Sequence, residues 1–105
     1  AISPKGGGKM KKYEAMYVFY PETSEEARNK FLDRIKSVIE AQEGKVTNTD
    51  DWGLRKLAYQ IKFKTEGYYF LMNFEAEEAV ILELTRIARI TDVLLRHMIV
   101  TDEDK

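Results

Sequence analysis

The chain has 105 residues, no cysteine, and 17 basic against 18 acidic side chains, which leave a net charge of −1. Its length fits a single domain that buries roughly 65% of its unfolded surface, and with 44% apolar residues it has the composition of a soluble globular protein. The lack of cysteine excludes disulfides, thiolate metal sites and a cysteine nucleophile, and fits a cytoplasmic protein. The near-zero charge argues against a protein that holds nucleic acid by bulk electrostatics alone.

The first nine residues are predicted to lie outside the core. They read AISPKGGGK, and a run of three glycines without apolar periodicity cannot contribute to a core. Because Met10 resembles a natural start, we expect residues 1–9 to be a cloning scar or a flexible extension and residues 10–105 to form one domain. Without Lys5 and Lys9 that domain has 15 basic and 18 acidic side chains, a net charge of −3.

A strand followed by a helix is predicted next. Residues 12–20 are rich in aromatic and β-branched side chains and stop at Pro21, as strands do. Thr23 and Glu26 have the spacing of a capping box, and Ser24 offers a second N-cap. Gly44 is expected to end the helix as a left-handed C′ residue. Four apolar residues share one helical face: Phe31, Ile35, Val38 and Ile39.

The rest of the chain is predicted to form two strands, a helix and a last strand. Residues 46–62 form the second strand, with a bulge at Gly53. A charged turn over 62–67 leads to a third strand at 68–74. A second amphipathic helix covers residues 77–89, with its acids first and its bases last, as the helix dipole favours. Residues 93–101 form the final strand.

This order is β-α-β-β-α-β, which is the ferredoxin-like α+β arrangement of a four-stranded antiparallel sheet with two helices. Right-handed crossovers place both helices on the same face of the sheet. The opposite face then has no element to cover it. We call it the open face.

The open face is predicted to be apolar. Alternation along the strands assigns nine residues to it: Met16, Val18, Tyr20, Tyr69, Leu71, Leu94, Met98 and Val100, with Arg96 among them. A contiguous apolar patch of this kind usually marks an interaction surface, so we expect a partner-binding face. A self-association face and a loosely tuned exposed sheet are the alternatives.

The sequence does not favour an enzyme. His97, the only histidine, is predicted to face the helices without a second group for acid–base chemistry. Asp50 and Asp51 are neighbours in an extended segment and therefore point to opposite faces. No serine has the surroundings of a nucleophile elbow. No apolar run approaches the roughly 20 residues that span a bilayer. We therefore expect no cofactor, metal, small-molecule substrate or membrane partner.

Basic residues cluster locally beside aromatic ones, which makes a small RNA contact an expectation and an ordinary solvated surface the alternative. The clusters are Lys11 and Lys12, Arg55 and Lys56, Lys62 and Lys64, Arg86 and Arg89, and Arg96. The start of the first strand and Arg96 are expected to lie near each other on neighbouring strands.

The most specific segment runs from Asp51 to Ile61 and reads DWGLRKLAYQI. It resembles the signature of the bacterial small-subunit ribosomal protein S-six family, Gly-x-basic-polar-Leu-Ala-Tyr-x-Ile. The matching residues are Gly53, Arg55, Lys56, Leu57, Ala58, Tyr59 and Ile61. The resemblance continues in the ranges 10–14, 67–74 and 96–98. One departure is Gln60, where many members of the family have proline.

The resemblance implies a non-enzymatic protein of the small ribosomal subunit, bound to the ribosome in the cytoplasm. The family pairs with the small basic ribosomal protein S-eighteen, and together they bind the central domain of the small-subunit ribosomal RNA. Carried over to this chain, the RNA contacts are Lys11, Lys12 and Arg96, then Arg55 and Lys56, then Arg86 and Arg89.

An RRM-like single-strand RNA-binding module shares this topology and is the alternative function. Its third-strand motif fits at Gly67 and Phe70 but fails at Glu66 and Asn73. The same alternation turns the aromatic Tyr68 and Phe70 toward the helices, away from any base. An acylphosphatase-like enzyme would need a glycine-rich anion loop after the first strand, which is missing. A small-molecule-binding regulator that self-associates through the open face is a further alternative.

Overall fold

The structure is a computed structural model that describes residues 10–101, so the predicted extension at 1–9 lies outside the described residues. The elements are β1 (Lys11–Phe19), α1 (Glu25–Ala41), β2 (Lys45–Ile61), β3 (Lys64–Ala76), α2 (Glu78–Ile90) and β4 (Leu94–Thr101). Their order confirms the predicted β-α-β-β-α-β arrangement.

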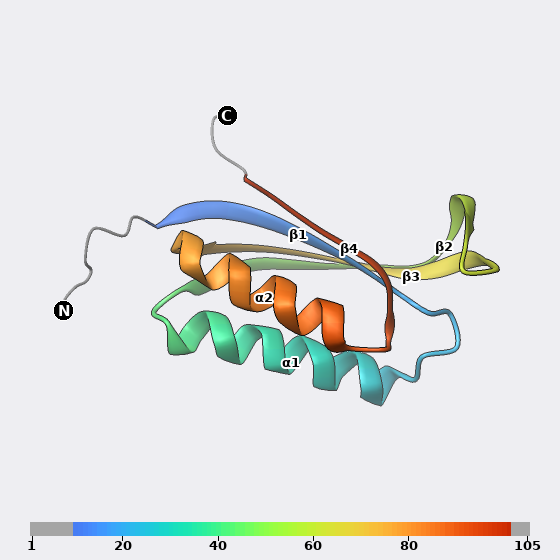
Figure 1. The fold of residues 1–105 in the computed structure, drawn as a ribbon, viewed down its shortest axis with the longest axis horizontal. Coiled ribbons are helices and arrows are strands. Elements are labelled where there is room, and N and C mark those ends of the chain that lie inside the picture. The colour runs from blue at the N-terminus through green and yellow to red at the C-terminus, as the bar shows by residue number, and fades with distance from the viewer. Residues whose placement is uncertain (1–9, 102–105) are drawn as a thin grey trace.

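The strands form one sheet in the order β2-β3-β1-β4. All three neighbouring pairs are antiparallel. Both helices pack on the same side of this sheet, and no helix covers the other side within residues 10–101 (Figure 1). The ferredoxin-like fold is therefore confirmed, and with it the open face.

The core lies between the helices and the sheet, and alternation along the strands explains its composition. Tyr17 and Phe19 point from β1 toward the helices and are fully buried. Phe31 of α1 meets both rings edge-on, at centroid distances of 5.3 Å to Tyr17 and 5.7 Å to Phe19. This aromatic contact joins α1 to the centre of the sheet.

Helix α1 begins after Ser24, the second of the two predicted caps. The Oγ of Ser24 accepts a hydrogen bond from the N–H of Ala27 at 3.1 Å. Thr23 instead offers its backbone carbonyl to the guanidinium of Arg28 at 2.9 Å.

The end of α1 corrects one prediction. The left-handed residue is Glu43, with φ of 68°, and not Gly44. The N–H of Gly44 donates to the carbonyl of Ile39 at 2.8 Å and that of Glu43 to Glu40 at 3.0 Å, which is a Schellman motif. Gly44 is needed for space, because a Cβ there would lie 2.7 Å from the carbonyl oxygen of Glu75.

The hairpin between β2 and β3 is longer than predicted. We expected a charged turn over residues 62–67, but β3 begins at Lys64 and pairs there with Ile61. Only Lys62 and Phe63 remain as the turn. The charged residues of β3 can stay in the ladder because this part of the hairpin extends beyond the ends of both helices (Figure 1).

Three register shifts interrupt β2, the first of them between Val46 and Asn48. Another lies between Asp51 and Gly53, where Gly53 has φ of +78°, which confirms the predicted bulge. The third shift lies between Lys56 and Ile61. Figure 1 shows that the end of β2 curls away from the sheet on the side opposite the helices.

Candidate nucleic-acid and partner interface

Five of the nine residues predicted for the open face meet around one small hollow. The register places Met16 beside Leu71 and Met98, and Val18 beside Tyr69 and Arg96. The hollow, of about 160 Å³, is lined by Met16, Val18, Tyr69, Arg96, His97 and Met98. Leu71 is half-buried next to Met16, and Val100 is 45% exposed at the far end of β4.

Two predicted members of the open face belong elsewhere. A register shift at the end of the β1–β4 pair sets Leu94 opposite Phe19 instead of on the open face, and Leu94 joins the helix-side core with 6% of its surface exposed. One extra residue in a strand reverses the alternation beyond it. Tyr20 follows the end of β1 and borders a hollow with Thr23 and Ala27 at the start of α1.

A small apolar cluster covers the open face near the end of β1. Val18 is only 3% exposed although no helix covers it. A Cβ added to Gly67 would lie 2.5 Å from Val18, and 3.5 Å from both Leu57 and Leu95, so these three side chains gather over the Gly67 backbone. Leu57 comes from the curled end of β2, and Leu95 is the residue that the shift in β4 turns to this face.

The same curl brings Tyr59 to Arg96. The Nη1 of Arg96 donates a hydrogen bond to the hydroxyl oxygen of Tyr59 at 3.0 Å. The two residues are 37 positions apart in the sequence and lie on non-adjacent strands. The tyrosine, 63% exposed, thus fixes the direction of a guanidinium that we predicted as an RNA contact.

Arg55 is held against an aromatic pair on the same face. The ring of Trp52 stacks on that of Tyr69 with centroids 6.2 Å apart and planes at 14°. The guanidinium of Arg55 lies 5.5 Å from the centroid of Trp52, and its Nε donates to the carbonyl of Trp52 at 3.1 Å. The indole N–H of Trp52 donates to Asp50 at 3.1 Å. Arg55 and Arg96 are therefore both placed by aromatic residues.

Asp51 points to the other face, as predicted. It accepts a hydrogen bond from the hydroxyl of Tyr68 at 3.0 Å, and this bond, with burial and the charge of the carboxylate, raises the pKa of Tyr68 above its usual value. The guanidinium of Arg28 lies 3.6 Å from the centroid of the Tyr68 ring. Asp50 and Asp51 thus bind different partners and form no carboxylate pair.

The predicted basic residues do not form one patch. Arg96 pairs with Val18 near the end of β1, whereas Lys12 lies near its beginning, so roughly 20 Å of strand separates them. The expectation that these two regions are close is therefore wrong, because the strands are antiparallel. Arg55 and Lys56 lie on the hairpin, at the same end of the sheet as Arg96.

Two further basic residues lie on α2. Arg86 forms an ion pair with Glu83 at 2.6 Å. Arg89 lies near His97, which shares the helix side of the sheet with its neighbour Tyr17. Burial, and then the charge of Arg89, lower the pKa of His97 below its usual value of 6.5.

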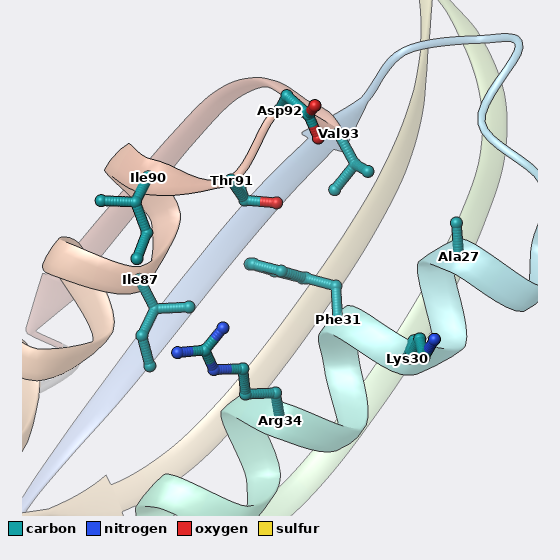
Figure 2. Close-up of a pocket in the computed structure, with 9 residues that line it drawn as sticks. All are labelled: Ala27, Lys30, Phe31, Arg34, Ile87, Ile90, Thr91, Asp92 and Val93. Atoms are coloured by element: carbon teal, nitrogen blue, oxygen red, sulfur yellow. The ribbon is translucent and has the colours of Figure 1, made fainter.

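The helix side also has a hollow, of about 390 Å³, between α1 and the end of α2 (Figure 2). Arg34 and Lys30 border it from α1, while Thr91 and Asp92 follow α2 on the opposite side. Asp92 supplies the only carboxylate among the lining residues, so this hollow holds no carboxylate pair. Residues 10–101 contain no cluster of metal-ligating side chains, and none of the helices in this range is long and apolar enough to cross a membrane.

Several residues of this interface escaped sequence reasoning: Trp52, Leu57, Tyr59 and Leu95. Three of them lie inside the segment that we singled out, so the signal was present, but their partners are set by the bulge and the curl of β2. Leu95 could be found only from the register of β4.

Comparison with known proteins gives a consistent family. The sequence profile of the family described as Ribosomal protein S6 matches residues 12–101. The small ribosomal subunit protein bS6 of Caldanaerobacter subterraneus subsp. tengcongensis is 48% identical over 95 residues, which cover 90% of this chain and 100% of that protein. The bS6 protein of Thermoanaerobacter pseudethanolicus is 50% identical over the same shares of both chains.

The fold agrees with a solved structure of the same name. The crystal structure of 30S ribosomal protein S6 from Thermotoga maritima superimposes with a TM-score of 0.81 and 32% identity, over 89% of this chain and 88% of that one. Proteins of this family are ribosome-bound components of the cytoplasmic translation machinery and not enzymes. The chain therefore belongs to the ribosomal protein S6 family of the bacterial small ribosomal subunit.

Proposed function

We propose that this chain binds the central domain of the small-subunit ribosomal RNA together with ribosomal protein S-eighteen, which docks on the open face. The single observation that carries the proposal is the hollow around Met16, Val18 and Met98 with Arg96 at its edge. It combines an apolar surface with a guanidinium that Tyr59 already orients. Such a surface suits a protein partner that also contacts RNA.

The charge of the chain supports a shared site. A domain with a net charge of −3 repels phosphate as a whole, so its own electrostatic contribution to RNA binding is small. A basic partner on the open face would neutralise most of the phosphates, while this chain contributes a few well-positioned basic side chains. Arg96 and Arg55 are the best supported of these, because aromatic neighbours fix both guanidinium groups on the open face.

The other predicted RNA contacts have less support from the geometry. Lys11 and Lys12 lie at the opposite end of β1 from Arg96 and would touch a different part of the RNA. Lys56 belongs to the hairpin next to Arg55. Arg86 and Arg89 extend from the helix side, and Arg86 is already paired with Glu83.

The RRM-like alternative is weaker on this geometry. An RRM stacks bases on aromatic residues of its exposed sheet face. Here the two aromatic residues that fit the RRM motif, Tyr68 and Phe70, lie on the helix side of the sheet and pack against its core, not on the open face.

Titration of a labelled central-domain RNA fragment tests the proposal, with the chain alone, S-eighteen alone, and both together. We expect tight binding of this chain only when S-eighteen is present. Equally tight binding by the isolated chain would contradict the shared site.

A matched pair of variants then tests whether the open face is the binding surface. Arg96→Ala should weaken the ternary complex more than Lys64→Ala, since Lys64 lies at the hairpin turn and pairs with Glu22 at 3.0 Å. Both side chains are at the surface, so neither change should unfold the chain. The reverse order of the two effects would show that the open face is not the binding face.

A further inference from the structure

The turn between β2 and β3 holds two non-glycine residues in the left-handed region. Lys62 has φ of 49° and Phe63 has φ of 65°, and the strands pair directly before and after them. A two-residue turn with both φ values positive is type I′, for which Asn-Gly is the usual sequence. Lysine and phenylalanine both carry a steric cost here, so the sequence of this turn is not the one that stability favours.

Phe63 gains nothing from the fold in return. Its side chain is 91% exposed, more than any other large apolar residue in the described part of the chain. It sits at the tip of a hairpin that extends beyond both helices (Figure 1). A strained backbone with a fully exposed aromatic ring indicates a role outside the chain's own core.

The segment around this ring is strongly basic. Residues 52–65, here called the hairpin arm, contain four basic side chains and no acidic one, within a domain of net charge −3. Among the described residues only Lys64 of the arm has a carboxylate partner, Glu22 at 3.0 Å. That ion pair ties the base of the turn to the loop after β1 and leaves Lys62 beside Phe63 at the tip.

We propose that the tip of the hairpin arm binds an unpaired RNA base, with Phe63 stacked on the base and Lys62 against a neighbouring phosphate. This inference rests on the proposed function and extends it to a contact away from the open face. Aromatic side chains recognise splayed-out nucleobases in RNA loops and bulges by stacking. Nearby lysine or arginine side chains supply the phosphate contact. Four positive charges without an acid favour RNA over an apolar pocket of a protein.

The test measures binding of the labelled central-domain fragment at saturating S-eighteen. Phe63→Ala should weaken binding about tenfold, within the roughly five- to hundredfold range for loss of one base–aromatic stack. Phe63→Leu should lose as much, because leucine is apolar but cannot stack, whereas Phe63→Tyr should bind like the unmodified chain. Leu82→Ala is the matched control, since Leu82 is 75% exposed on α2 and should not affect binding.

Two results would overturn the inference. One is unchanged binding by Phe63→Ala. The other is a loss with Phe63→Ala that Phe63→Leu restores, which would indicate an apolar protein contact. Lys62→Gln gives a second readout, because the slope of log affinity against log salt should fall by about one. Phe63 variants should melt at or above the temperature of the unmodified chain, so that loss of folding cannot explain weaker binding.

The proposed function and this inference can fail separately. If the unmodified chain does not bind the fragment with S-eighteen, the proposed function falls. The inference is then decided with a single-stranded adenylate octamer at low salt, measured by the emission of Phe63→Trp minus that of the unmodified chain, whose only tryptophan is Trp52. Quenching by the octamer supports stacking at the tip, and its absence overturns it.

Discussion

The two faces of the sheet are both apolar, but they are covered in different ways. On the helix side, Tyr17, Phe19 and Phe74 are at most 1% exposed under α1 and α2. On the open face, Val18 is buried beside Leu57 and Leu95, while Met98, which lines the same hollow as Val18, stays 46% exposed. Burial on the first face stabilises the fold. On the second face it is incomplete, and what remains exposed is available for a partner.

The largest expected effect compares one residue from each face. Leu84→Ala removes a fully buried side chain of α2 and should lower the free energy of unfolding by about 3 kcal/mol. Met98→Ala should lower it by less than about 1 kcal/mol, because the side chain is already half in water, yet it should weaken the complex with S-eighteen. Urea unfolding and the RNA titration measure the two quantities. Equal losses of stability would show that the faces do not differ as described.

Gly67 tests whether the cluster on the open face is tightly packed. A Cβ at this position would lie 2.5 Å from the Cγ1 of Val18, and valine is stiff about χ1. Gly67→Ala should therefore cost about 2 kcal/mol of stability, as overpacking does. In a Val18→Ala background the same change should cost far less, since the contacting methyl group is gone. Additive costs would mean that the cluster is loose.

The helix side has a defect of its own. Tyr17 is fully buried, and its hydroxyl has no hydrogen-bond partner within residues 10–101, while desolvation strongly raises its pKa. An unsatisfied buried hydroxyl is costly, so Tyr17→Phe should raise the free energy of unfolding by about 1 kcal/mol. Tyr68→Phe is the control, because it removes a hydroxyl that donates to Asp51 and should not stabilise. Destabilisation by Tyr17→Phe would indicate a partner for the hydroxyl.

Sequence reasoning predicted the element order and most of the core because both follow from periodicity. It failed where one extra residue in a strand reverses the alternation of side chains between the two faces. The shift in β4 sends Leu94 to the core and Leu95 to the open face, and no residue in that stretch is a glycine or proline that would signal it. The bulge at Gly53, by contrast, was predicted, because glycine favours the left-handed conformation found there.

Two other features depend on contacts between distant segments. The rule that glycine takes the left-handed position favoured Gly44, yet Gly44 is required by the close approach of Glu75, and Glu43 takes the strained conformation instead. Tyr59 reaches Arg96 only because the end of β2 curls to the side of the sheet opposite the helices. The resemblance to the family indicated from the sequence that Tyr59 and Arg96 matter, but not that they touch.

The smallest expected effect concerns His97, at the margin of the helix side. Burial and then the charge of Arg89 lower the pKa of its imidazole in the folded chain below 6.5, so the unfolded chain binds more protons in this range. Stability is then complete above about pH 6.5 and falls as the pH drops through the folded pKa. The step is small because the ring is partly exposed and screened. Glu22 and Glu83 do not contribute to this step, since hydrogen bonds to Lys64 and Arg86 lower their pKa below 4.5. Urea unfolding between about pH 7.5 and pH 5.5 should show the decrease for the unmodified chain and not for His97→Gln. A decrease of the same size in both would assign it to other groups and leave His97 without influence on the fold.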